Sequence, residues 1–158
     1  MPTVRLSTRC RSSFGSKGDL VAKFLAQKLD LGLAPSWHSG RDPIVAFGSL
    51  LSLISGSLGK IGADVALLAQ NEVGAITLAG GGGSSAMAHK SNPVKAEVLV
   101  SLARFNAGLA GALHQALVHE NERSGAAWTL EWLVLPQMLA ATGAGLRLAR
   151  EMLGQMEF

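Results

Sequence analysis

The sequence contains one cysteine, Cys10, no tyrosine, and few aromatic or charged residues. A single cysteine excludes an intramolecular disulfide and a cysteine-based zinc site, and it fits a reducing compartment, so we expect a cytoplasmic protein. The uncharged run over residues 43–59 contains proline, glycine and serine, and it is shorter than the ~20 apolar residues of a transmembrane helix. We therefore expect no membrane partner. The low charge and high hydrophobic content also exclude a disordered polar tail as the whole chain.

The basic residues are concentrated at the N-terminus. The first 17 residues carry four basic and no acidic side chains, whereas the rest carries ten basic and eleven acidic side chains. The body of the chain is therefore close to neutral, which predicts no nucleic-acid partner. Residues 1–16 are rich in Arg, Ser and Thr, like a transit peptide, but we expect them to form a disordered or non-native arm. Residues 17–158 are expected to form a helical domain.

Apolar residues recur at helical spacing in four segments, which predicts an all-α fold of long helices. The predicted helices span residues 19–29, 43–70, 94–119 and 126–154. Asp19 is the expected N-cap of the first helix, Asp42 and Pro43 are a start signal for the second, and Pro136 predicts a kink in the fourth. The second helix contains four glycines, each of which costs a helix about 1 kcal/mol relative to alanine. Their presence predicts close approach of other helices.

A glycine-rich segment, residues 79–93, interrupts the helical pattern and ends at Pro93, where the third helix begins. It presents two hydroxyls, an imidazole, an ammonium and a carboxamide on Ser84, Ser85, His89, Lys90 and Asn92. Its spacing matches neither a Walker loop nor a dinucleotide fingerprint. A helix start carries unsatisfied N–H groups and partial positive charge, so the segment suits a carboxylate or a phosphate. On composition alone, a flexible linker followed by a helix cap explains it equally well.

Residues 83–93, GSSAMAHKSNP, resemble the signature of the fumarase/aspartase superfamily, Gly-Ser-Ser-x-Met-Pro-x-Lys-x-Asn-Pro. The form found here is similar to the branch that holds the adenylosuccinate lyase and 3-carboxy-cis,cis-muconate cycloisomerase families. Residues 36–42, 68–74 and 114–138 resemble the second family more closely. The resemblance covers about residues 14–155. It departs at Ala88, where the signature has a proline that would stiffen the loop.

The resemblance implies catalytic roles at the signature segment. Ser84 corresponds to the superfamily's acid/base, with Ser85 as the alternative hydroxyl. Lys90 and Asn92 correspond to groups that bind a substrate carboxylate and stabilise an enediolate-like intermediate. Glu97 corresponds to a glutamate that partners a histidine from another segment, although a first-turn carboxylate also interacts favourably with the helix dipole. His89 is expected to support the loop or the substrate.

Further along the chain, Arg123 and Ser124 resemble a contact to a substrate carboxylate, for which arginine is well suited. Arg41 is a candidate substrate-binding residue, or it acts with Asp42 at a helix start. Trp128 and Trp132 are one helical turn apart, which predicts core packing or a helix–helix contact. The histidines show no metal spacing, and we expect no metal site. These histidines are His38, His89, His114 and His119.

The resemblance implies the reversible lactonisation of 3-carboxy-cis,cis-muconate to 4-carboxymuconolactone, in protocatechuate breakdown, without a cofactor. The substrate is a small tricarboxylate. The alternatives are a C–N lyase similar to adenylosuccinate lyase and a non-catalytic remnant that assembles with helical partners. The implied fold is part of the superfamily's central helical domain, in which four copies form a homotetramer and share active sites. Because the other signature regions are missing, we expect the isolated chain to have little or no activity.

Overall fold

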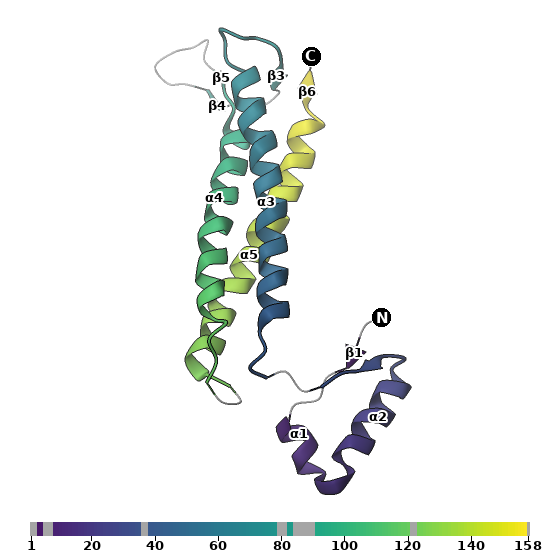
Figure 1. Cartoon of the computed structure of the whole chain (residues 1–158). Helices are drawn as coiled ribbons and strands as arrows, with labels where there is room; N and C mark the ends of the chain where they lie inside the picture. Colours follow the sequence, from purple (N-terminus) through teal and green to yellow (C-terminus); the bar gives the residue numbers. More distant parts are fainter. Residues whose placement is uncertain are drawn as a thin grey trace.

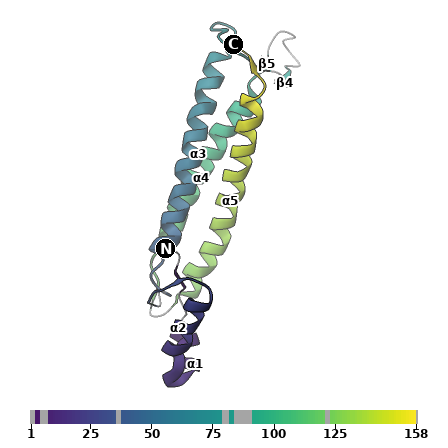
Figure 2. The same cartoon turned by 90° about the vertical axis from the view of Figure 1, so that its right-hand side faces the viewer.

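The computed structural model describes residues 3–4, 8–35, 38–78, 82–83, 91–120 and 123–157. Its body is an elongated bundle of three long helices that run up, down and up (Figures 1 and 2). These helices are α3 (Asp42–Leu68), α4 (Val94–Gln115) and α5 (Gly125–Leu153). They pack against one another along their lengths. The all-α, long-helix architecture predicted from the apolar spacing is therefore confirmed.

A smaller helical unit lies beside the end of the bundle where α3 begins (Figure 1). It consists of α1 (Thr8–Ser13), the 3-10 turn η1 (Gly15–Lys17) and α2 (Gly18–Lys28). A parallel ladder joins β1 (Thr3–Val4) to β2 (Gly32–Leu33). Residues 1–16 were predicted to form a disordered or non-native arm, and the structure places helical turns over residues 8–13 and 15–17 of this region.

Contacts between α1 and α2 explain this difference. A Cβ on Gly18 would lie 2.2 Å from the carbonyl oxygen of Arg11, so the close approach of the two helices requires glycine. The Arg11 guanidinium forms an ion pair with the Asp19 carboxylate. Asp19 was predicted to be the N-cap of α2, but it lies in the first turn of that helix. The N-cap position is occupied by Lys17.

Two short antiparallel ladders lie at the opposite end of the bundle. β3 (Thr77–Leu78) pairs with β6 (Met156–Glu157), and β4 (Gly82–Gly83) pairs with β5 (Ser91–Asn92). The second ladder joins the two flanks of the signature segment directly before α4. A Cβ on Gly82 would lie 2.8 Å from a Val94 methyl group, so this strand lies close against the start of α4.

The bundle core consists of two apolar clusters. The cluster nearer β3 and β6 contains Val65, Ile76, Ala96, Leu99, Ala149 and Met152. The cluster nearer the start of α3 contains Val45, Leu51, Leu113, Val134 and Met138. Buried side chains from all three helices contribute to these clusters, which accounts for the apolar spacing in the sequence.

A buried polar layer lies between the two apolar clusters. The Asn106 side-chain amide on α4 donates hydrogen bonds to Ser55 Oγ on α3 (2.7 Å) and Thr142 Oγ1 on α5 (2.9 Å). It also lies 3.3 Å from the Met138 carbonyl oxygen. The Ser55 and Thr142 hydroxyls are themselves 3.2 Å apart. Because each partner comes from a different helix, the layer specifies one axial register of the bundle.

The glycines of α3 lie where α4 approaches closely, as predicted. A Cβ on Gly59 would lie 2.5 Å from Ala103 Cβ, and one on Gly62 would lie 2.6 Å from the Ala96 carbonyl oxygen. Gly48 is packed in the same way against the Leu113 side chain. Gly56 is the exception, because a Cβ there would meet no described atom within 4 Å.

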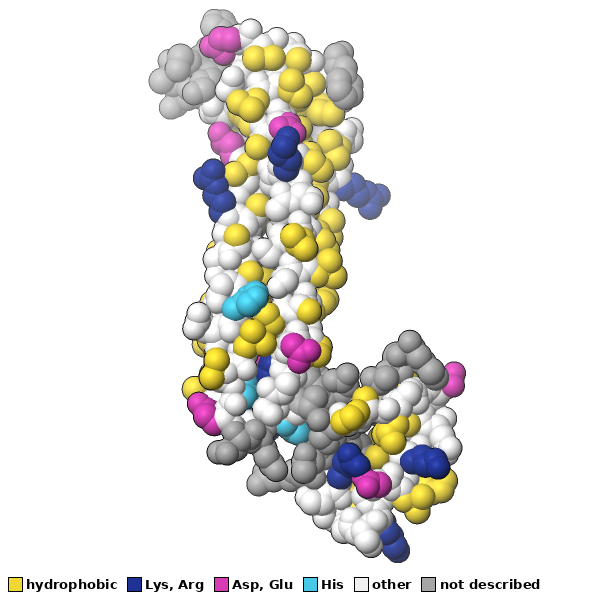
Figure 3. Space-filling model, viewed as in Figure 1, with side chains coloured by type: hydrophobic (Ala, Val, Ile, Leu, Met, Phe, Trp, Pro, Cys, Tyr) yellow, Lys and Arg dark blue, Asp and Glu magenta, His cyan; other side chains and the backbone are white. Residues whose placement is uncertain are grey.

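Much apolar surface remains exposed along the bundle, and Figure 3 shows apolar side chains along its length. By length and composition alone, α3 and α4 would be able to cross a membrane. In the bundle, however, both helices also contribute buried residues to the core. Exposed large side chains of the bundle include Leu50, Leu53, Phe105, Leu133, Leu139 and Leu146. One chain alone therefore leaves the outer faces of its bundle without apolar partners.

Candidate functional site at the two ends of the bundle

Two of the predicted site residues lie at the signature end of the bundle. Asn92 is partly buried in β5 opposite Gly82, and Glu97 is exposed in the first turn of α4. The predicted acid/base Ser84, its alternative Ser85, and the loop residues His89 and Lys90 lie outside the described residues, as does Ala88. The β4–β5 ladder places both flanks of this segment beside the α4 N-terminus, where unpaired backbone N–H groups favour an anion.

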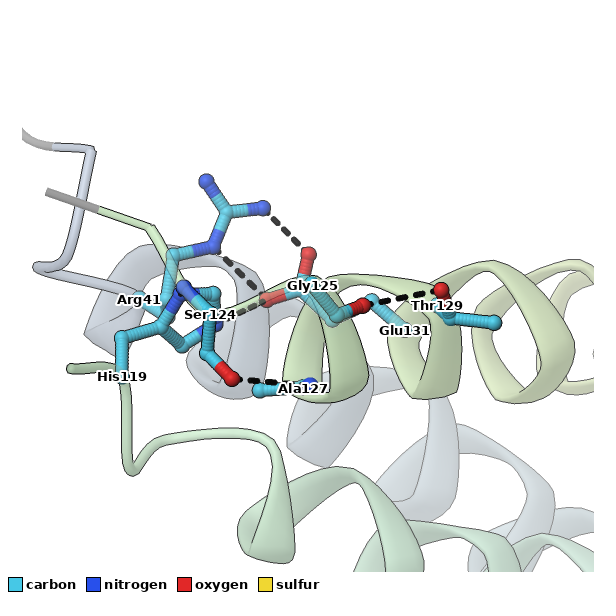
Figure 4. A network of polar contacts seen from close by, with 7 residues as sticks. All are labelled: Arg41, His119, Ser124, Gly125, Ala127, Thr129 and Glu131. Carbon is cyan, nitrogen blue, oxygen red and sulfur yellow. Dashed lines mark hydrogen bonds and ion pairs between the residues drawn. The ribbon is translucent and has the colours of Figure 1, made fainter.

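The other predicted residues, Arg41, Arg123 and Ser124, lie at the opposite end. Arg41 and Ser124 belong to a cluster centred on Glu131 (Figure 4). Glu131, in the second turn of α5, is only 3% exposed. The Arg41 guanidinium at the start of α3 binds it through both oxygens, with Nε donating to Oε1 at 2.7 Å and Nη2 donating to Oε2. Sequence reasoning gave Arg41 the substrate or Asp42 as alternative partners. In the structure it forms a largely buried ion pair with a residue 90 positions away.

His119, in the connection between α4 and α5, completes the cluster. Its side chain is buried, and Nδ1 accepts a hydrogen bond from the Ser124 backbone N–H at 3.2 Å. Because Nδ1 is an acceptor, the ring proton of neutral His119 lies on Nε2. Nε2 lies 3.8 Å from Glu131 Oε1 and makes no hydrogen bond with any described residue.

Ser124 is the N-cap of α5. Its backbone is extended and its Oγ accepts a hydrogen bond from the Ala127 N–H at 3.4 Å. In a capping box, a Glu or Gln three residues after the cap would accept the N–H of the cap residue itself. Alanine occupies that position here, and the His119 imidazole takes its place as acceptor. The start of α5 is therefore held by a side chain from outside the helix.

The Ser124 side chain also interacts with Glu120. A hydrogen bond from Ser124, together with one from the backbone of Glu120, lowers the pKa of the Glu120 carboxyl below its ordinary value. Glu120 itself is fully exposed. The charged form of Glu120 therefore favours the folded connection before α5.

Arg123 is exposed and lies over an aromatic ring. Its guanidinium carbon is 4.2 Å from the centroid of the Trp128 ring, and the centroids of Trp128 and Trp132 are 4.6 Å apart. Trp132 is 63% exposed. Core packing, one of the two interpretations of this tryptophan pair, is therefore wrong for Trp132, because that side chain lies on the outer side of α5. A cation–π contact of this kind orients the guanidinium without neutralising its charge.

The predicted site residues are thus divided between the two ends of one chain. Asn92 and Glu97 flank the start of α4, whereas Arg123 and Ser124 follow its end. Since α4 has 22 residues, its ends lie roughly 33 Å apart at about 1.5 Å per residue. A small tricarboxylate cannot contact both groups within one copy of the chain.

Sequence reasoning did not identify Glu131 as part of this site. A signal was present, because Glu131 is the only charged residue between Arg123 and Arg147, in an otherwise apolar and polar-neutral stretch. A lone carboxylate on a helix that packs in a core requires a partner. The partner, Arg41, is too distant in sequence to be predicted from local spacing. Among the described residues, no cluster of three His, Cys, Asp or Glu side chains is arranged to hold a metal ion.

The long-helix bundle and its signature segment both agree with a family of lyases. The sequence profile of a lyase family matches residues 14–106, which is more than half of the chain. The chain belongs to this lyase family.

Among the individual relatives that match this chain are 3-carboxy-cis,cis-muconate cycloisomerases. The chain is 44% identical to the 3-carboxy-cis,cis-muconate cycloisomerase of Pseudomonas putida over 143 residues, which are 88% of this chain and 34% of the relative. The crystal structure of the 3-carboxy-cis,cis-muconate lactonizing enzyme from Pseudomonas putida superposes with a TM-score of 0.80 and 41% identity, covering 92% of this chain and 32% of that one.

A relative with another activity is similarly close. The nitrosuccinate lyase of Streptomyces davaonensis is 42% identical over 130 residues, which are 78% of this chain and 27% of the relative. The chain spans about a third of the length of the curated relatives that it matches.

Proposed function

We propose that the chain contributes the signature segment and the α5 start to a cycloisomerase that interconverts 3-carboxy-cis,cis-muconate and its lactone. The observation that carries the proposal is the close match to the lactonizing enzyme from Pseudomonas putida, which extends over 92% of this chain. The signature segment adds chemical support, because it combines hydroxyl, ammonium and carboxamide groups beside a helix N-terminus.

The proposed reaction is an internal addition in which the substrate tricarboxylate takes up one proton and becomes a lactone with two carboxylates. A carboxylate oxygen of the substrate bonds to one carbon of a conjugated double bond, and the displaced electron pair moves into another carboxylate as an enediolate. Ser84 then delivers a proton to the adjacent carbon, and the reverse reaction removes that proton. Lys90 and Asn92 stabilise the enediolate, because its negative charge develops beside them.

Residues at the other end of the bundle bind the rest of the substrate in this proposal. The exposed Arg123 guanidinium, oriented by Trp128, binds a substrate carboxylate. Ser124 assists through its position at the start of α5, where the helix dipole favours an anion.

The distance between the two groups requires more than one copy of the chain. We expect copies to pack through the exposed apolar faces of α3, α4 and α5, so that the signature end of one copy meets the Arg123 end of another. In a homotetramer built around such helices, the apolar faces are covered and the signature end of one copy meets the Arg123 end of another. The proposed assembly therefore explains why apolar residues cover the outside of a bundle that already has a core.

A lyase that cleaves a C–N bond of a substituted succinate is the second candidate. It is supported by the 42% identity to nitrosuccinate lyase and by the similarity of the signature to the adenylosuccinate lyase family. Both candidate reactions abstract or deliver a proton next to a carboxylate, so the same Ser84, Lys90 and Asn92 serve either one. They differ in the leaving group and not in the proton-transfer step.

The ultraviolet absorbance of the conjugated diene of 3-carboxy-cis,cis-muconate provides the test. We expect little or no turnover by the 158-residue chain alone, and turnover when the segments that complete the family's signature regions are added. Ser84→Ala should abolish the restored activity. Turnover near ~10 s⁻¹ by the chain alone would show that the chain is self-sufficient. Release of fumarate from nitrosuccinate or adenylosuccinate, without loss of the diene, would replace the proposal with the second candidate.

A further inference from the structure

The start of α5 is held by a buried polar cluster from three separate segments of the chain. Arg41 comes from the start of α3, His119 from the α4–α5 connection, and Glu131 from the second turn of α5 (Figure 4). Glu131 and Ser124 are seven residues apart, so they lie two turns apart on the same side of α5. The cluster therefore spans the part of the helix that follows Arg123 directly.

The polar composition of this cluster calls for an explanation other than stability. Two opposite charges removed from water are seldom more stabilising than apolar side chains of the same volume. Both oxygens of Glu131 are bound by the Arg41 guanidinium, an arrangement that fixes the plane and the position of the carboxylate. The pair therefore fixes the position of the start of α5 relative to α3.

His119 transmits this geometry to the residues before α5. Its Nδ1 accepts the Ser124 N–H, and its Nε2, with the proton, faces Glu131 at 3.8 Å. One ring thus connects the N-cap of α5 with the buried ion pair, and Arg123 is the residue directly before that cap. The Arg123 side chain then reaches the Trp128 ring from a fixed backbone position.

From this arrangement we infer that His119, which lies beside the Arg41–Glu131 ion pair, is a positioning residue that orients Arg123 and Ser124 toward a substrate carboxylate. The inference rests on the proposed function, since it concerns the same carboxylate-binding end of the site. Its contribution is indirect, because His119 is buried and faces other protein groups and not the substrate.

Two isosteric variants separate the functions of the imidazole nitrogens. His119→Asn places an oxygen where Nδ1 lies, so it preserves the acceptor for the Ser124 N–H. His119→Gln places an amide N–H near the position of Nε2, so it preserves only the group that faces Glu131. His114→Gln is the matched control, because His114 is exposed and its Nδ1 lies 2.8 Å from the Ala110 carbonyl oxygen of its own helix.

The first measurement is nuclear magnetic resonance of the 158-residue chain, which needs no activity. The ¹⁵N shifts of His119 should show a proton on Nε2 and an unprotonated Nδ1. The Arg123 side-chain protons should be shifted upfield by the Trp128 ring. We expect this ring shift to persist in His119→Asn and His114→Gln and to be lost in His119→Gln. An unchanged Arg123 shift in His119→Gln would overturn the inference.

The second measurement is the KM for 3-carboxy-cis,cis-muconate in the reconstituted assembly. His119→Gln should raise KM about tenfold, the effect of weakening one charge-assisted hydrogen bond to the substrate, while kcat changes much less. His119→Asn should stay close to the unsubstituted protein. An increase for Arg123→Ala without one for His119→Gln would overturn the positioning role and leave the proposed function intact.

Glu131→Gln tests whether the Arg41–Glu131 ion pair is needed for this positioning. If it folds, it should raise KM as His119→Gln does, because the amide no longer fixes the Arg41 fork. If it does not fold, the His119 variants still decide the question. An unchanged KM in Arg123→Ala would overturn the binding role of Arg123 and this inference with it, whereas loss of activity in Ser84→Ala reports on the lactonisation separately.

Discussion

At two glycines of α3, Gly62 and Gly56, an added methyl group is expected to change the stability of the fold in opposite directions. Gly62 on α3 lies against the α4 backbone, and a Cβ there would be 2.6 Å from the Ala96 carbonyl oxygen. Backbone atoms cannot move aside as a flexible side chain can. Gly56, on the same helix, has open space at the corresponding position. The two glycines thus separate the packing cost of a methyl group from its effect on helix propensity.

Gly62→Ala should lower the free energy of unfolding by about 1–3 kcal/mol, because the helices must move apart. Gly56→Ala should raise it by up to about 1 kcal/mol, since alanine favours the helix and meets no other atom. Urea denaturation followed by circular dichroism measures both. A loss of stability in Gly56→Ala would instead show that another chain covers this position.

Glu120 is expected to make the stability of the α4–α5 connection depend on pH. Its folded-state pKa is lowered, first by the hydrogen bond from Ser124, so its contribution is present above the unfolded pKa and is lost as pH falls through the folded one. The melting temperature of the unsubstituted chain should exceed that of Glu120→Gln at pH 7. The difference should shrink below about pH 4.3, the ordinary glutamate value. A difference that grows on acidification would contradict the assignment.

At the scale of the helices, the polar layer around Asn106 fixes how the three long helices are aligned. Each apolar cluster alone would tolerate a shift of one helix along another, since apolar contacts are not directional. Moving α4 by one turn would take the Asn106 amide away from Ser55 and Thr142 and leave it buried without partners. The layer therefore penalises misaligned packings more than it stabilises the correct one.

Asn106→Ala is predicted to lower the free energy of unfolding by about 2–4 kcal/mol, from lost hydrogen bonds and the cavity left behind. Ser57→Ala is the control, because Ser57 is exposed and bonds only to the Leu53 carbonyl of its own helix. That control should change stability by less than about 0.5 kcal/mol. Equal effects of the two substitutions in chemical denaturation would exclude a special role for the layer.

The helices could be predicted from sequence because their signals are local. Apolar spacing, Pro43 and Pro93 gave starts that agree with α3 and α4 to within one residue. The end of α4 was predicted at residue 119, whereas the helix ends at Gln115. Beyond that end, the His119 imidazole accepts a hydrogen bond from the Ser124 N–H at the start of α5, an interaction that apolar spacing does not signal. α1 was missed because its contacts with α2 are an ion pair and a close approach at Gly18, neither of which produces apolar spacing.

The site could be predicted only in part. The signature residues are contiguous, so sequence alone identified the segment from Ser84 to Asn92, of which the structure describes only Ser91 and Asn92. The Arg41–Glu131 pair joins positions that are 90 residues apart, and no local pattern links them. The alternatives left open for Arg41 reflect that limit, because a helix start offers an arginine several neighbours of equal plausibility.

At the scale of the whole molecule, we expect the copies to contact one another through the outer faces of the bundle. Leu53, on α3, is 70% exposed, although α3 also contributes buried residues to the core. We expect Leu53→Glu to lower the solution mass measured by light scattering, because a charge cannot be buried between copies without a partner. Leu20→Glu is the matched control on α2, where Leu20 is 52% exposed away from the bundle. A mass unaffected by either substitution would place the contact between copies elsewhere.

The length of α4 has a genetic consequence for any enzyme assembled from copies of this segment. The signature residues and Arg123 lie at opposite ends of that helix, so in the proposed assembly a single active site would take each group from a different copy. An assembly in which every copy is damaged at Ser84 would lack the proton donor, and one in which every copy is damaged at Arg123 would bind the substrate weakly. In a mixed assembly, an undamaged signature end from one can face an undamaged Arg123 end from the other. Two alleles that fail separately should therefore restore part of the activity when they are expressed together.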